Sequence, residues 1–212
     1  MPRHALLLGA TGLVGREILR LLLGDAAVER VTVIARRPTG NAHTKLDERI
    51  LDLGEMQQHP DAFAADAIFC ALGTTIKTAG SQDRFRVVDY DYPLMAARLG
   101  KQQGAQHYLL VSALGANAGS RVFYNRVKGE VERDLLALNY PRTTIARPSL
   151  LLGEREEFRL GERVFERLGW LVPPAYKPIH ARDVAAALVG ASHAQESGVQ
   201  ILESRAMRAR RK

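Results

Sequence analysis

The sequence predicts an α/β fold, in which a doubly wound parallel sheet is covered by helices on both faces. Short apolar stretches alternate with amphipathic stretches along most of the chain, as the strands and connecting helices of a parallel sheet do. A glycine-containing turn, GATGLVG at residues 9–15, joins the first apolar stretch to the first amphipathic one. This order of strand, turn and helix is typical of sheets built from successive β-α-β units.

The expected strands are short and rich in apolar or β-branched residues, which suits strands that are buried on both faces. In chain order they cover residues 4–8, 31–35, 49–53, 66–72, 107–112, 143–147 and 198–203. Helices are expected where apolar residues recur at helical spacing. They cover the residues from Leu13 to a stop at Gly24, 89–103, 121–138 and 183–191, with Asp183 as the cap of the last one.

The length of 212 residues fits a single domain. Residues 153–178 are the one candidate for a small lid or substrate segment, and residues 205–212 form a basic tail. Hydrophobic residues make up 46% of the chain, which is enough for a core. The single cysteine, Cys70, gives no internal disulfide. Because neither a secretory leader nor a membrane-spanning stretch is recognisable, the sequence predicts a cytoplasmic protein without membrane contact.

The net charge of +7 is concentrated at one end of the chain. The tail from residue 204 onwards contains five basic residues and no acid, which leaves +2 for the rest of the chain. Basic and acidic residues alternate through that remainder, and no basic stripe with spaced aromatic residues is present. The sequence therefore argues against nucleic-acid binding by the folded body, and it predicts a solvated, frayed tail.

The turn GATGLVG predicts a dinucleotide site, although its spacing is G-x-x-G-x-x-G rather than G-x-G-x-x-G. Gly9 permits the tight turn, Gly12 lets a pyrophosphate approach the backbone, and Gly15 lets the helix pack closely on the strand. The first N–H groups of the helix would then face the phosphates. A glycine turn in a non-binding α/β protein is the alternative. The predicted cofactor-binding residues are Gly9, Ala10, Thr11, Gly12, Leu13, Val14 and Gly15.

The end of the second expected strand indicates which dinucleotide would bind. Arg36 and Arg37 stand about 20 residues past the glycines, where an Asp or Glu would contact the ribose 2′-hydroxyl of NAD. Guanidinium groups instead suit the 2′-phosphate of NADP, so NADP(H) is preferred and NAD(H) is the other option. Two surface arginines in a loop are the alternative. Asp52, with Leu53 beside it, would contact the adenine or remain a solvated turn acid.

Tyr124 and Lys128 lie four residues apart in FYNRVKGEVERDLLAL, so they share one face of the expected helix. An ammonium group beside a phenol stabilises the phenolate and moves its pKa from about 10 towards neutrality. Such a tyrosine can exchange a proton with a carbonyl or alcohol oxygen while a nicotinamide carries the hydride. The alternative is a surface ion pair between Lys128 and Glu132.

Five segments together resemble one family: GATGLVG, CALGTTIKTAGS, VSALGA, YNRVKGEVE and RPSLLLGE. They are similar to the atypical short-chain dehydrogenase/reductases, and among these to the Tat-interacting-protein-like oxidoreductases with an NAD(P)H-binding domain. The similarity runs from about residue 5 to residue 183. It implies a Rossmann fold, a nicotinamide cofactor and a Ser–Tyr–Lys catalytic group.

Carried onto this sequence, the resemblance implies that Tyr124 transfers the proton, that Lys128 supports it and binds the nicotinamide ribose, and that Ser112 holds the substrate oxygen. Ser120 is a second candidate for the serine. The cofactor would also run along Ala71, Leu72, Gly73 and Thr74 after the fourth strand, and along Arg147, Pro148 and Ser149 after the sixth. Extended members of the superfamily carry a long carboxy-terminal substrate domain, whereas only about 60 residues follow the sixth expected strand here, so a small substrate lid is expected.

These observations favour an NADP(H)-dependent oxidoreductase that reduces a small-molecule carbonyl, aldehyde or quinone, with Tyr124 as the acid. A cofactor-sensing interaction protein without turnover is the alternative. An NAD-dependent epimerase or dehydratase is a second one, against which Arg36 and Arg37 speak. The six histidines form no metal-spaced set with Cys70 or with paired carboxylates, so no metal is expected. The sequence leaves the substrate, a protein partner and a homo-oligomer open.

Overall fold

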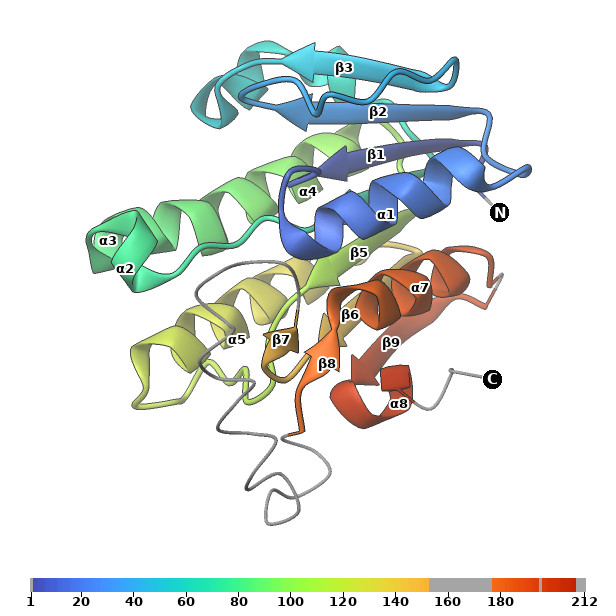
Figure 1. Cartoon of the computed structure of the whole chain (residues 1–212). Helices are drawn as coiled ribbons and strands as arrows, with labels where there is room; N and C mark the ends of the chain where they lie inside the picture. Colours follow the sequence, from blue (N-terminus) through green and yellow to red (C-terminus); the bar gives the residue numbers. More distant parts are fainter. Residues whose placement is uncertain (1, 153–176, 195, 209–212) are drawn as a thin grey trace.

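Seven parallel strands form one sheet in the order β3-β2-β1-β4-β5-β6-β9 (Figure 1). The structure is a computed structural model that describes residues 2–152, 177–194 and 196–208. The strands are β1 (His4–Leu8), β2 (Arg30–Ala35), β3 (Leu46–Ile50), β4 (Ala67–Cys70), β5 (His107–Val111), β6 (Arg142–Arg147) and β9 (Gly198–Glu203). The order reverses between β1 and β4, where doubly wound folds open at the carboxyl ends of their strands. The predicted doubly wound parallel sheet, a Rossmann fold, is confirmed.

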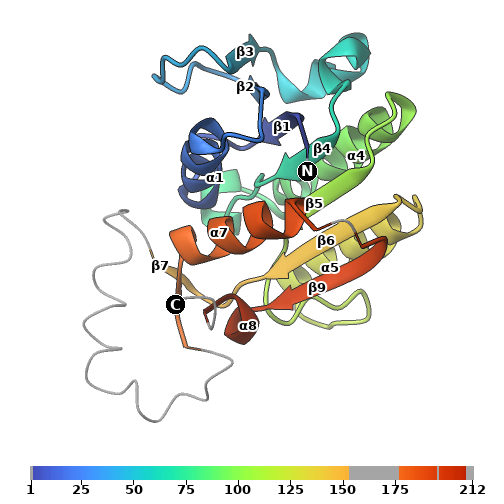
Figure 2. The ribbon, with the colours of Figure 1, turned by 90° about the vertical axis from the view of Figure 1, so that its right-hand side faces the viewer.

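Helices cover both faces of the sheet (Figure 2). On one face lie α1 (Leu13–Gly24) and α7 (Ala181–Ser192), side by side. On the other lie α4 (Tyr92–Gln102) and α5 (Phe123–Leu136). Because neighbouring residues of a strand point to opposite faces, each strand contributes side chains to both layers of the core.

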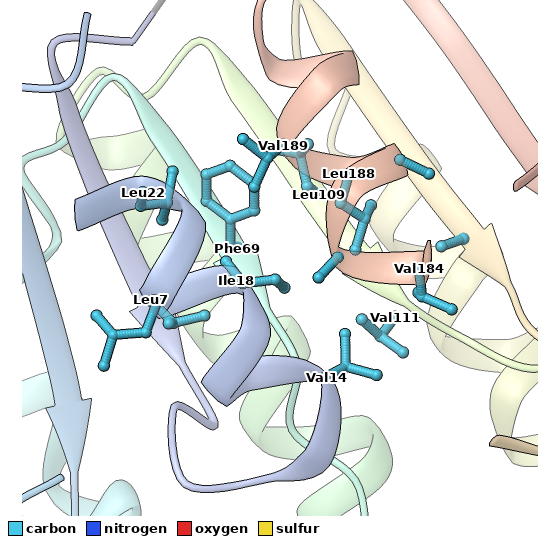
Figure 3. Close-up of a cluster of buried hydrophobic side chains, with 14 of the residues drawn as sticks. Leu7, Val14, Ile18, Leu22, Phe69, Leu109, Val111, Val184, Leu188 and Val189 are labelled. Carbon is cyan, nitrogen blue, oxygen red and sulfur yellow. The ribbon is translucent and has the colours of Figure 1, made fainter. Parts of the chain in front are cut away.

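The core beneath α1 and α7 is built from large apolar side chains (Figure 3). Ile18 and Leu22 of α1 and Leu188 of α7 gather with Phe69 of the sheet, and all four are fully buried. Burying a side chain of this size contributes about 1.5–3 kcal/mol. The contact between the two helices therefore holds α1 against the sheet, and Val14 in the first turn of α1 belongs to the same cluster.

Short elements connect these layers. The 3₁₀ turns η1 (Leu53–Gln58) and η2 (Pro60–Phe63) follow β3, and the helices α2 (Ile76–Ala79) and α3 (Gln82–Arg86) follow β4. A π-helical turn, η3 (Val87–Asp91), leads from α3 directly into α4. A second, two-stranded parallel sheet joins β7 (Leu151–Leu152) to β8 (Ile179–His180), which the sequence does not predict because strands this short leave no pattern.

Two elements begin earlier than the sequence predicts. The third strand is predicted at 49–53 but lies at Leu46–Ile50, because backbone pairing with β2 sets its register. As an edge strand it accepts polar residues, while the apolar Leu53 turns into the core. The helix predicted over 89–103 is preceded by α3 and η3, so helical backbone already starts at residue 82.

The carboxy-terminal region corrects two further predictions. Part of the basic tail is folded rather than frayed, because the five residues of α8 (Ser204–Arg208) bury Met207 in the core beneath α1 and α7. Asp183 lies in the first turn of α7 rather than at its cap, since that helix already begins at Ala181. Residues 153–176 of the predicted lid and 209–212 of the tail lie outside the described residues. No helix within the described ranges has the length and apolarity that a membrane crossing requires.

His107, the first residue of β5, makes stability depend on pH. Its Nε2 lies 2.9 Å from the Thr144 hydroxyl oxygen, whereas its Nδ1 is buried without a hydrogen-bond partner. Burial, assisted by the positive charge of Arg142, lowers the pKa of His107 to about 4 from an ordinary value of 6.5. The folded state therefore holds the neutral ring. Its stabilising contribution is complete above pH 6.5 and is lost as the pH falls towards 4.

We expect the free energy of unfolding to fall by about 3 kcal/mol over this range through His107 alone. Urea unfolding at several pH values measures the effect. The matched variant His107→Gln keeps a polar side chain that does not titrate, so its stability should change less over the same range. If the free energy of unfolding of the two proteins changed equally with pH, His107 would not be the cause of the pH dependence.

Candidate functional site

The glycine turn lies at the carboxyl end of β1, beside the end of β4. Gly9 has a φ of +82°, and a Cβ on it would come within 2.5 Å of the Ala71 carbonyl oxygen. A Cβ on Gly15 would lie 2.0 Å from the Gly9 carbonyl oxygen, so α1 packs this closely only with glycine there. Gly12 is the N-cap of α1 and offers no capping side chain to its first N–H groups. The bare backbone and the positive end of the helix dipole fit a pyrophosphate.

Several of the predicted cofactor residues contribute backbone rather than side chain to this region. Ala10, Val14 and Leu53 are buried in the hydrophobic core, so their side chains do not face a ligand. The remaining residues around the turn are accessible to a ligand. Thr11, Leu13, Ala71, Leu72 and Thr74 are half-buried, and Gly73 is exposed.

Arg36 and Arg37 follow β2 directly and are both exposed. Neither side chain forms a hydrogen bond or an ion pair with another described residue, so both can meet an anionic ligand. Asp52 is exposed and caps η1, since its carboxylate accepts a hydrogen bond from the Gly54 N–H at 2.8 Å. Of the two predicted alternatives, an adenine contact and a solvated acid in a turn, this geometry corresponds to the second. The phenol of Tyr92 lies nearby: burial and Asp52 raise its pKa, and Arg36 opposes them.

Tyr124 and Lys128 lie on one face of α5, and both turn inward. Tyr124 is half-buried, and its ring packs against Phe85 of α3 with 5.6 Å between the ring centroids. The Lys128 side chain is only 6% exposed, and its Nζ lies 2.7 Å from Oδ1 of Asp89 in η3. The contact is a close ion pair rather than an aligned hydrogen bond. The alternative of a surface pair between Lys128 and Glu132 is therefore wrong.

The prediction that the pKa of Tyr124 moves towards neutrality is also wrong, although Lys128 does act in that direction. Burial raises the pKa of the phenol above 10, Lys128 lowers it, and Asp89 raises it again, with burial as the largest influence. The pKa of Lys128 itself ends above its ordinary value, because Asp89 and Tyr124 outweigh the lowering that burial causes. At neutral pH the site therefore holds a protonated phenol beside a charged ammonium group.

Ser112 lies at the end of β5 and is 4% exposed. Its hydroxyl donates a short hydrogen bond to the Glu132 carboxylate, so its proton is not directed at a substrate oxygen. Ser120 differs, because its hydroxyl oxygen accepts from the Val122 N–H at 3.1 Å and its own proton has no acceptor among the described residues. No hydrogen bond joins either serine to Tyr124 in the described part of the chain.

The segment after β6 is held by the same carboxylate. Arg147 binds Glu132 through two nitrogens, with Nη2 at 2.6 Å from Oε2 and Nε at 3.1 Å from Oε1. It also reaches Glu203 of β9 at 3.2 Å. The Pro148 carbonyl oxygen accepts from Leu114 N–H at 2.8 Å. Ser149 donates to the Lys177 carbonyl oxygen at 2.5 Å. The predicted cofactor segment is therefore fixed in place, with the Arg147 guanidinium already engaged.

Sequence reasoning missed Asp89 as a site residue, and it considered Glu132 only as a surface partner. Asp89 stands between apolar residues in VVDYDYP, a signal for a buried acid. Glu132 follows Tyr124 and Lys128 at the same spacing of four, which places all three on one helix face. Figure 1 shows that the start of α5, α2 and α3 lie at the end of the sheet to which the strand arrows point. Among the described residues, no three His, Cys, Asp or Glu side chains gather as a metal site.

Comparison with known proteins agrees with this geometry. The profile of the semialdehyde dehydrogenase NAD-binding domain matches residues 4–83, which contain the glycine turn and both arginines. Protein FMP52-1, mitochondrial, of Scheffersomyces stipitis is 41% identical over 157 residues, which cover 72% of this chain and 69% of that protein. Protein HTATIP2 of Rattus norvegicus is 35% identical over 178 residues, which cover 82% and 73%.

The chain belongs to the family of FMP52 and HTATIP2. This family is the Tat-interacting-protein branch of the atypical short-chain dehydrogenase/reductases, as the resemblance of the motifs implies. It is a family of NAD(P)-binding Rossmann oxidoreductases, and together with the matched NAD-binding domain it supports binding of a nicotinamide dinucleotide. The structure of MoeE5 in complex with UDP-glucose and NAD shares the fold, with a TM-score of 0.75 and 16% identity over 94% of this chain and 75% of MoeE5.

The comparison overturns one prediction. The expected cytoplasmic location is wrong, because the FMP52 relatives from several yeasts are named as mitochondrial. The features on which that prediction was based, such as the single cysteine Cys70, do not distinguish the cytoplasm from mitochondria.

Proposed function

We propose that this member of the family is an NADP(H)-dependent oxidoreductase that reduces a small-molecule carbonyl compound, an aldehyde or a quinone. The observation that carries the proposal is the inward-facing pair of Tyr124 and Lys128, which lies at the same end of the sheet as the glycine turn. Following the names of the FMP52 relatives, the reaction would take place in mitochondria.

The residues of the chain would supply the proton and the geometry, while the nicotinamide supplies the hydride. Because burial raises the pKa of Tyr124, its phenol keeps the proton at neutral pH and can donate it to a carbonyl oxygen. The Lys128 ammonium group then stabilises the phenolate that remains. Since Ser112 directs its proton to Glu132, Ser120 is the serine whose hydroxyl can still donate to a substrate oxygen.

The preference for NADP(H) follows from the exposed pair Arg36 and Arg37, which can form charge-assisted hydrogen bonds with a 2′-phosphate. We expect the double variant Arg36→Ala/Arg37→Ala to bind NADPH about 10- to 100-fold more weakly, since such bonds contribute about 1.5–3 kcal/mol. Its affinity for NADH should not change, because NADH lacks the phosphate. Fluorescence titration of both nucleotides measures the two affinities.

Arg98→Ala is the matched control, because Arg98 is also exposed but belongs to the second half of α4, and this helix runs towards the amino ends of the strands. It should leave both affinities unchanged. Tighter binding of NADH than of NADPH by the unaltered protein would contradict the arginine argument.

Turnover is tested with a panel of aldehydes, ketones and quinones, by following the loss of NADPH absorbance. The proposal expects NADPH oxidation with at least one carbonyl class. Retained NADPH binding without turnover on any of them would instead favour the cofactor-sensing protein.

A further inference from the structure

The ion pair between Asp89 and Lys128 is almost completely buried. The two side chains are 1% and 6% exposed. Removing two charges from water costs several kcal/mol per ion, so such a pair adds little net stability compared with apolar residues. Stability of the fold alone therefore does not account for a carboxylate at this position.

Asp89 joins three segments of the site. Its Oδ1 lies 2.7 Å from Lys128 Nζ of α5, and its Oδ2 accepts a hydrogen bond from the Thr74 N–H at 2.9 Å. Thr74 belongs to the segment after β4 that is predicted to run along the cofactor. The π-helical turn η3 places Asp89, and turns of this kind often occur at functional sites.

We propose that Asp89 is a positioning residue, whose carboxylate offsets part of the charge of the Lys128 ammonium group and thereby keeps Tyr124 protonated for the reduction of a carbonyl group. The inference rests on the proposed function, and it adds the direction in which the site is prepared to work. An isolated lysine would favour the phenolate, which is the form that accepts a proton from an alcohol. A lysine whose charge is partly offset instead leaves the phenol protonated, as a donor.

The surroundings of Tyr124 support this balance. Two charged groups among the described residues act on its pKa: Lys128 on the same helix, which lowers it, and Asp89 of η3, which raises it. From α3 the phenol meets the uncharged ring of Phe85. The protonation state of Tyr124 in the described structure therefore depends on burial and on how completely Asp89 offsets Lys128.

The test replaces the charge and keeps the shape. Asp89→Asn retains an oxygen that can accept from the Thr74 N–H, but it leaves Lys128 unopposed. Tyrosinate absorbance is recorded against pH without cofactor, and each protein is compared with its Tyr124→Phe counterpart, so that the difference reports this phenol alone. The proposal expects the phenolate of Asp89→Asn to appear at lower pH than that of the unaltered protein.

Two further variants keep the test decisive. Asp89→Glu restores the carboxylate and should return the titration towards that of the unaltered protein. Asp89→Asn/Lys128→Met removes both charges, so the phenolate of Tyr124 should no longer appear at lower pH. This variant has no unpaired buried charge, so it can still be measured if Asp89→Asn does not fold. An unchanged or higher phenolate titration in Asp89→Asn, or a shift that persists in the double variant, would overturn the proposal.

The pH profile of NADPH-dependent reduction is the second measurement. The alkaline limb should move to lower pH in Asp89→Asn, because less Tyr124 is protonated there. The absorbance titration needs neither cofactor nor substrate. An absence of turnover would therefore count against the proposed function, whereas an unshifted titration would count against Asp89.

Discussion

Replacement of Tyr124 by phenylalanine is expected to reduce the rate of carbonyl reduction about 100- to 10,000-fold, which is the contribution that a positioned general acid typically makes. The variant lacks the phenolic O–H but keeps the ring that packs against Phe85, so the fold and the NADPH affinity should be preserved. Steady-state kinetics with the best substrate of the carbonyl panel, together with an NADPH titration, measures both quantities.

Tyr140→Phe is the matched control for this experiment. Its hydroxyl donates to the Ala97 carbonyl oxygen at 2.5 Å, and Tyr140 precedes the amino end of β6, whereas the site lies at the carboxyl ends of the strands. Loss of that hydrogen bond should lower stability by about 1 kcal/mol and leave the rate unchanged. Equal rates for Tyr124→Phe and the unaltered protein would remove the tyrosine from the mechanism and favour the cofactor-sensing alternative.

Gly15→Ala is expected to destabilise the protein and to abolish dinucleotide binding. The added Cβ would lie 2.0 Å from the Gly9 carbonyl oxygen and 3.0 Å from the Ala10 Cα, both of which are backbone atoms that cannot move aside by changing rotamer. Overpacking of this kind costs about 1–3 kcal/mol or more, and α1 would have to shift away from the glycine turn. Urea unfolding and NADPH titration measure the two consequences.

Gly24→Ala is the matched control in the same helix, since a Cβ there would meet nothing within 4 Å. Alanine has the higher helix propensity, so this variant should be about as stable as the unaltered protein or up to about 1 kcal/mol more stable. If Gly15→Ala matched Gly24→Ala in stability and NADPH affinity, the close packing of the turn would not be required.

The sequence was sufficient to predict those parts of the fold whose conformation depends on residues close together in the chain. The glycines of GATGLVG were predictable because a left-handed turn and a helix start in contact with backbone exclude other side chains. The strands β1 and β5 were predictable because each consists of residues that are largely buried on both faces. The edge strand β3 was displaced by three residues, since its position depends on pairing with β2 rather than on its own polar residues.

The electrostatics of the site could not be predicted in the same way. The spacing of Tyr124 and Lys128 identified the helix face, but the direction of the pKa shift of Tyr124 depended first on burial and then on a carboxylate from η3 that opposes Lys128, and neither follows from the spacing. Glu132 stands one turn from Lys128, yet it pairs with Arg147 of β6. Nearness in sequence favoured a pair between the two helix residues, whereas tertiary contacts gave each of them a partner on another element.

The separate pairing of these two helix charges constrains how the sequence can diverge. Loss of one member of a buried ion pair leaves the other charge buried without a partner. This lowers the free energy of unfolding by about 3–5 kcal/mol, which is a large part of the stability of a domain. Replacement of both members together avoids that penalty. Because Lys128 takes part in the proposed reaction, position 89 should keep a carboxylate wherever Lys128 is kept, whereas positions 132 and 147 should change together among descendants of this protein.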